Sequence, residues 1–146
     1  MSGTRAIQRF EVSLKAFIVR DDGRALFVRE ADTGFWELPG GRIDVGEEWE
    51  AHASILAREI GEELGAQFRF ETGDHVVTWV RQRPIDGVFQ FIVGRLCRHR
   101  GGTLELSAEH AECAWLGAEE SLALGFPPTS GYTDALRRLW PLAGRR

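Results

Sequence analysis

The 146-residue sequence contains little lysine, little cysteine and no long apolar segment. Lys15 is the only lysine among 18 basic residues, so 17 are arginine. Arginine matches phosphate geometry, although the base composition of a genome is the simpler explanation of this bias. No segment reaches the roughly 20 apolar residues that span a bilayer, and residues 1–10 have no apolar run of signal-peptide type. These absences predict a cytoplasmic protein without membrane contact.

The two cysteines and the net charge exclude further classes of protein. Cys97 and Cys113 have a spacing that matches no zinc or redox motif, so both are interpreted as reduced, buried thiols rather than as a disulfide. The formal net charge of −4 argues against extended nucleic-acid binding, which requires many phosphate-neutralising cations. A polyanionic substrate would need a local basic pocket or a bound metal ion. The length predicts a single domain over residues 1–146, with its core at about 10–140.

Alternating β-forming residues and turn signals predict a sheet that helices cover. Strands are expected at 10–20, 24–29, 75–83 and 88–98, with short extended segments at 35–38, 104–106 and 112–116. A helix before Gly65 is predicted from an apolar stripe at helical spacing: Trp49, Ala53, Leu56, Ala57, Ile60 and Leu64. A second helix is expected at 132–140, capped by Thr129 or Ser130. The predicted fold class is α/β of the α+β kind, a mixed sheet sandwiched between helices.

The first predicted helix carries three carboxylates on one side. Glu59, Glu62 and Glu63 stand at positions i, i+3 and i+4. Like charges at that spacing repel by a few tenths of a kcal/mol per pair. A hard divalent cation would turn this repulsion into attraction, because Mg²⁺ prefers carboxylate and water oxygens. A solvated acidic helix face is the alternative interpretation.

Two runs of residues resemble the box motif of the Nudix hydrolases, in their MutT-like branch. Residues 40–47 read GGRIDVGE and residues 58–65 read REIGEELG, and the lead-in WELPGG at 36–41 is also similar. The family motif is Gly, five residues, Glu, seven residues, Arg-Glu-aliphatic, any residue, Glu-Glu, any residue, Gly-aliphatic. The sequence departs from this motif at Ala66, which is small, and between Glu47 and Arg58, where it has three extra residues.

The insertion leaves two candidates for the first glutamate of the motif. Glu47 keeps the motif's spacing from Gly41, and Glu50 keeps its spacing to Arg58. Glu47 is favoured, because a glycine-rich loop should stay rigid while a longer helix start absorbs the insertion. Three residues lengthen a helix by about 4.5 Å.

The resemblance implies Mg²⁺-dependent hydrolysis of a phosphoanhydride bond, with Mn²⁺ as a substitute ion. The substrate would be a nucleoside diphosphate linked to another group, such as a nucleoside triphosphate or a nucleotide sugar, and water would attack phosphorus. The implied metal ligands are the Gly41 carbonyl, Glu47, Glu59, Glu62 and Glu63. Either Glu59 or Glu62 would be the base, and Arg58 would hold a carboxylate. An acidic residue in a later loop would complete the site, with Glu109 favoured and Glu112 as the alternative.

Substrate-binding residues outside the motif are less specific. Phe35 and Trp79 could stack on a base, while Arg81 and Arg83 share one side of a predicted strand and could meet phosphate. Core aromatics and solvated arginines are the alternatives. The only tyrosine, Tyr132, lies far from the place of the tyrosine found in diadenosine-polyphosphate hydrolases. A small nucleoside triphosphate pyrophosphohydrolase, alone or as a homodimer, is therefore the default expectation.

Two other functions occur on this fold. Isopentenyl diphosphate isomerase needs a catalytic cysteine near its active site, but this chain has none before Cys97. A Nudix domain that has lost catalysis and senses or binds a nucleotide usually loses glutamates of the motif, whereas this chain keeps all three on the helix. The insertion is the one feature that favours lost activity.

Overall fold

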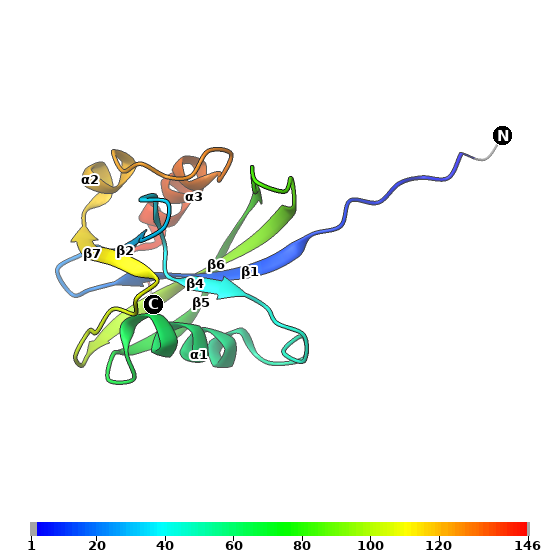
Figure 1. Cartoon of the computed structure of the whole chain (residues 1–146). Helices are drawn as coiled ribbons and strands as arrows, with labels where there is room; N and C mark the ends of the chain where they lie inside the picture. The colour runs from blue at the N-terminus through cyan, green and yellow to red at the C-terminus, as the bar shows by residue number, and fades with distance from the viewer. Residues whose placement is uncertain (1–2, 146) are drawn as a thin grey trace.

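The computed structural model describes residues 3–145, which form one mixed sheet with helices on both faces (Figure 1). The strands are β1 (Glu11–Val19), β2 (Ala25–Glu30), β3 (Trp36–Glu37), β4 (Gly40–Arg42), β5 (Arg69–Gln82), β6 (Phe89–Gly101) and β7 (His110–Leu116). Their order is β3-β2-β1-β6-β5, while β4 pairs with β1 and β7 with β2. The β1–β6 pair is parallel and the other pairs are antiparallel. The predicted fold class is confirmed.

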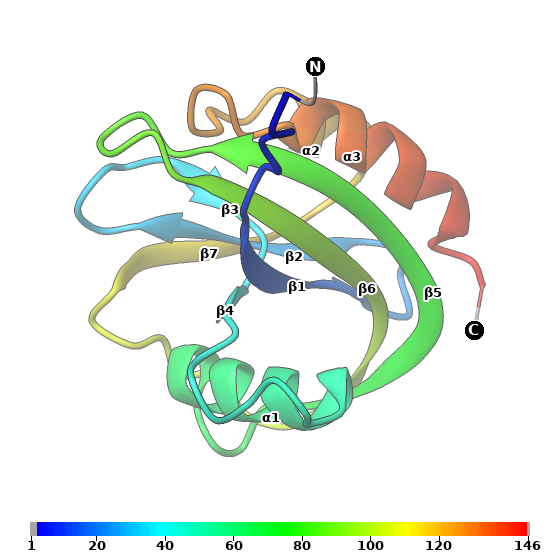
Figure 2. The same cartoon turned by 90° about the vertical axis from the view of Figure 1, so that its right-hand side faces the viewer.

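The helices divide the core into two layers. Helix α1 (His52–Leu64) lies on one side of the sheet, and α2 (Ala118–Leu122), α3 (Tyr132–Leu139) and a 3₁₀ turn (Trp140–Leu142) lie on the other (Figure 2). Strand β1 serves both layers, because alternate side chains point to opposite faces of a sheet. Leu14 and Ile18 pack in the α1 layer, whereas Phe17 packs in the α3 layer. Lys15 shares the face of Phe17 and therefore opens toward the α3 side of the sheet.

The first helix begins later than its apolar pattern predicts. It starts at His52 with Ala51 as its N-cap, and Trp49 is 94% exposed. The predicted stripe is therefore wrong at its N-terminal end, and burial is confined to Ile55, Leu56, Ile60, Glu63 and Leu64. Residues 43–51 instead form turns, in which Glu47 N–H donates to Asp44 O and Glu50 N–H to Glu47 O. Residues 48–51 therefore belong to a loop and not to the helix.

Several smaller expectations also need correction. Residues 104–106 form no strand, because the backbone of this segment forms hydrogen bonds with the end of α1. Glu105 N–H donates to Leu64 O, and Ser107 N–H donates to Glu63 O. The short helix α2 was not predicted. Gly131, with φ of 70°, is the N-cap of α3 in place of Thr129 or Ser130.

The cysteines agree with the expectation of free thiols, although the expected burial holds for only one of them. Cys97 and Cys113 are free thiols, the first buried and the second half-buried. Among residues 3–145, no helix is long and apolar enough to cross a membrane.

Candidate active site

The glycines of β4 bring the backbone close to helix α1. A Cβ at Gly40 would collide with the Leu14 carbonyl oxygen, and the φ of 143° there also requires glycine. A Cβ at Gly41 would lie 2.7 Å from Oε1 of Glu59, closer than real Cβ atoms approach another heavy atom. The Glu59 carboxylate therefore occupies the space that any other side chain at position 41 would fill.

Arg58 connects the loop to the helix carboxylates. Its Nε and Nη2 donate to the two carboxylate oxygens of Glu47 at 2.7 and 2.6 Å, a bidentate pair. Its Nη2 also donates to Glu59 at 3.0 Å, and Nη1 donates to Glu62 at 3.3 Å. Hydrogen bonding from Arg58 lowers the pKa of Glu47. Glu47 also accepts the Asp44 N–H at 3.0 Å, so the pair anchors the turn that precedes α1.

The three carboxylates of α1 have different surroundings. Glu63 is buried, and its Oε2 accepts the Gly40 N–H at 3.2 Å. Burial raises the pKa of Glu63 to about 8, against the opposing effect of the Lys15 charge, and burial also raises the pKa of Glu59. The side chain of Glu59 is 13% exposed and that of Glu62 is 62% exposed. Although Glu59, Glu62 and Glu63 lie on the same side of the helix, they therefore differ in exposure to solvent.

The donor chemistry fits a hard divalent cation, although the ligands are not gathered into one cluster. Within residues 3–145, no group of three or more His, Cys, Asp or Glu side chains is close enough to hold a metal ion. Glu59 and Glu63 lie against Gly41 and Gly40, whereas the exposed Glu62 pairs with Arg58. Carboxylate and carbonyl oxygens are the ligands that Mg²⁺ accepts. Glu59, Glu63 and the Gly41 carbonyl are the residues that would hold such an ion, and Glu62 could join only by leaving Arg58.

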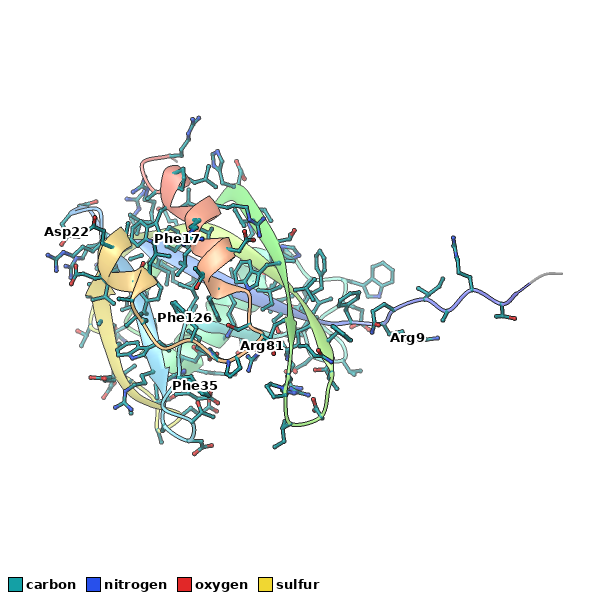
Figure 3. The ribbon with its side chains drawn as sticks, turned by 90° about the horizontal axis from the view of Figure 1, so that it is seen from above. Arg9, Phe17, Asp22, Phe35, Arg81 and Phe126 are labelled. Atoms are coloured by element: carbon teal, nitrogen blue, oxygen red, sulfur yellow. The ribbon has the colours of Figure 1, made fainter. Side chains whose placement is uncertain are left out.

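A cleft of about 420 Å³ opens beside Gly40 and Glu63. Its lining is almost entirely polar: Ser13, Lys15, Glu30, Asp32, Glu37, Gly40, Gly41, Arg42, Glu63, Arg81, Arg83, Gln90, Glu109 and His110. Arg81 lies near the middle of the molecule when viewed from above (Figure 3). The cleft thus combines four basic side chains with five acidic ones.

The structure separates the later candidate residues. Glu109 lines the cleft, whereas Glu112 lies on β7 and pairs with Arg29 at 2.8 Å. Arg81 and Arg83 both line the cleft. Arg83 follows the last residue of β5, so it does not share a strand with Arg81 as predicted, and it forms a 2.6 Å ion pair with Asp86 in the turn.

The predicted aromatic face is not part of the cleft. Trp79 is only 5% exposed and packs on Tyr132, with 5.7 Å between ring centroids. Gly94 leaves room for the Trp79 ring, which belongs to the core. Phe35, labelled in Figure 3, is half-buried on the loop before β3. It is not among the residues that line the cleft. Trp79 is therefore corrected from a substrate-binding residue to a packing residue, since large apolar side chains in strands fill the core first.

Lys15 and Glu37 are cleft residues that the sequence did not single out. Their Nζ and Oε1 atoms are 3.5 Å apart, and both side chains are largely buried. Burial acts to lower the pKa of Lys15, but the surrounding charges, Glu37 first among them, raise it above its ordinary value. A lone lysine within an apolar strand was the available signal, because a buried ammonium requires a charged partner.

The raised pKa of Glu63 predicts how stability depends on pH. With a folded pKa of about 8 against an ordinary 4.5, protonated Glu63 supports folding below pH 4.5, and this contribution is lost as pH rises through 8. Glu63→Gln stays neutral. We therefore expect its stability relative to wild type to grow across this window and level off above it, as measured by urea unfolding at several pH values. A constant difference would contradict the raised pKa.

Comparisons with known proteins identify a domain family and a related sequence. The family model for the NUDIX domain matches residues 9–136. A MutT-like protein of Streptomyces ambofaciens is 36% identical over 109 residues, which are 75% of this chain and 65% of that protein. The match thus spans slightly less than two thirds of that relative.

Two solved structures illustrate the similarity of fold. The solution structure of the E. coli ORF135 protein is 26% identical with a TM-score of 0.71, over 95% of this chain and 94% of that one. A C. elegans Ap4A hydrolase is 21% identical with a TM-score of 0.74, over 92% of this chain and 98% of that one. With the matched domain model and the MutT-like relative, these findings show that the chain belongs to the Nudix family.

Proposed function

We propose that this protein is a Nudix pyrophosphohydrolase, which hydrolyses a phosphoanhydride bond in a nucleoside diphosphate linked to another group. The observation that carries the proposal is the contact of Glu59 and Glu63 with the Gly40–Gly41 backbone at the edge of a cleft that also contains Arg81 and Arg83. Nudix proteins generally use a divalent metal ion. Mg²⁺, with Mn²⁺ as a substitute, is the ion that these oxygen donors suit.

The residues of the site have two roles: some would bind the metal ion, and one would accept a proton from the attacking water. Mg²⁺, when bound, supplies the positive charge that lets an anionic diphosphate approach a group of carboxylates. Glu59 is the favoured base, because its carboxylate is largely buried beside Gly41 and burial raises its pKa above the ordinary value. Glu62 is the alternative. Arg58 orients Glu59 and Glu47 through hydrogen bonds, and Glu109 lines the same cleft as Glu63.

A catalytically weak, nucleotide-sensing domain is the second candidate function. The observation that favours it is the engagement of Glu47, Glu59 and Glu62 by a single arginine, together with an inserted loop before α1. Such an arrangement would satisfy the carboxylates without a metal ion. A hydrolysis assay distinguishes the two functions, because only the enzyme would cleave the bound nucleotide.

A substrate panel tests the proposal. The purified protein is incubated with Mg²⁺ and nucleoside triphosphates, nucleotide sugars, ADP-ribose, dinucleoside polyphosphates or capped RNA, and the products are identified. Within the described residues, no Phe, Tyr or Trp lines the cleft, so stacking on a base contributes little there. We therefore expect the kcat/KM values of the four common ribonucleoside triphosphates to lie within about tenfold of each other. Binding without hydrolysis of any compound would favour the sensing domain.

A further inference from the structure

Glu37 lies between two cations on the wall of the cleft. Its Oε1 is 3.5 Å from Nζ of Lys15, and its Oε2 is 4.0 Å from Nη1 of Arg81. The three side chains are 14%, 9% and 17% exposed, respectively. Each carboxylate oxygen therefore faces a different cation, in surroundings where water screens the charges only partly.

The three residues come from distant parts of the sheet. Glu37 is on β3 and Arg81 on β5, which stand at opposite ends of the strand order, and Lys15 is on β1 in the middle. Figure 2 shows the strong curvature of β5 and β6. Curling of the sheet brings its two ends together across the cleft, so Glu37 joins strands that share no backbone hydrogen bonds.

The backbone next to Glu37 is anchored by a hydrogen bond. The N–H of the next residue, Leu38, donates to the buried hydroxyl of Tyr132 at 3.2 Å. On the other side, Lys15 pairs in register with Gly40, next to the glycine turn. The carboxylate therefore sits on a fixed stretch of backbone, while its two partners have long, flexible side chains.

The cations keep unused hydrogen-bonding capacity. Nε of Arg81 is buried and has no hydrogen-bond partner among the described residues. Among the described residues the Lys15 ammonium forms one ion pair, with Glu37 at 3.5 Å, although an ammonium carries three donors. Both residues line the cleft. Buried donors without partners carry an energetic penalty unless a ligand satisfies them.

We infer that Glu37 is a positioning residue, which holds Lys15 and Arg81 so that their ammonium and guanidinium groups bind phosphate oxygens of the substrate. This inference deepens the proposed function, because it assigns the phosphate-binding cations of the same cleft. Glu37 touches no phosphate itself. It orders two flexible side chains before the ligand arrives, which lowers the entropic penalty of binding.

The test is binding of inorganic tripolyphosphate by calorimetry, with Mg²⁺ and again with EDTA. Glu37→Gln removes a negative charge, so Coulomb attraction alone predicts tighter binding of the polyanion. Positioning predicts the opposite, and we expect binding about tenfold weaker. Lys15→Met and Arg81→Met should each weaken binding similarly. Glu37→Gln should have little further effect when both cations are replaced, because contacting residues act non-additively.

Asp32→Asn is the matched control. Asp32 lines the same cleft and is exposed, so its neutralisation should tighten binding about two- to threefold through charge alone. Thermal unfolding of each variant checks that its fold is retained. Equal or tighter binding by Glu37→Gln would overturn the inference, as would a wild-type protein that binds tripolyphosphate under neither condition. If the binding pattern holds but the substrate panel shows no hydrolysis, the proposed enzyme activity fails and the inference stands.

Discussion

Glu63→Gln is expected to lower turnover about a hundredfold, and Glu62→Gln at least about tenfold, while both variants stay folded. Glu63 is buried against the Gly40 N–H, at the place where carboxylate and glycine backbone would share a metal ion. Glutamine preserves the volume of the side chain but not its charge. Glu62 is exposed and would have to leave Arg58 to take part, so its loss should matter less.

Steady-state hydrolysis of the preferred triphosphate with Mg²⁺ measures both effects. Glu105→Gln is the matched control, since this exposed glutamate lies in the loop beside the end of α1 and outside the cleft. Its turnover should equal that of wild type. Unchanged turnover in both Glu62→Gln and Glu63→Gln would refute the assigned carboxylates.

Gly41→Ala is expected to lower turnover about tenfold or more without unfolding the protein. The added Cβ would lie 2.7 Å from Oε1 of Glu59, so the carboxylate must move away from the Gly41 backbone. The φ of Gly41 is not in the left-handed region, and the alanine backbone is therefore unstrained. The change acts on the position of Glu59 and leaves its chemistry intact.

Two other glycines make this prediction specific. Gly61→Ala places its Cβ in open space within α1, so it should keep wild-type turnover and stabilise the helix by about 1 kcal/mol. Gly40→Ala would collide with the Leu14 carbonyl at a φ of 143°, so it should destabilise the fold by about 3 kcal/mol or more. Turnover and urea unfolding of the three variants are measured together. Wild-type turnover in Gly41→Ala would show that the close approach of Glu59 has no catalytic role.

The insertion shows how far a motif can be interpreted from its spacing alone. The sequence favoured Glu47 over Glu50, and the structure pairs Glu47 with Arg58 at 2.6 Å. Turns occupy residues 43–51, and α1 starts only at His52, later than the sequence predicted. Apolar spacing could not place this boundary, since Trp49 fits the helical stripe and yet is exposed.

The sequence by itself determined the family, the mixed sheet between helices and the carboxylates beside a glycine turn. These features depend on offsets of a few residues, where the geometry of one helix or turn decides which groups meet. The tertiary structure alone decided that Trp79 is core, that Glu109 rather than Glu112 lines the cleft, and that Glu37 joins Lys15 to Arg81. Such contacts join strands far apart in the chain, and they form only because the sheet curls until its two ends meet across the cleft.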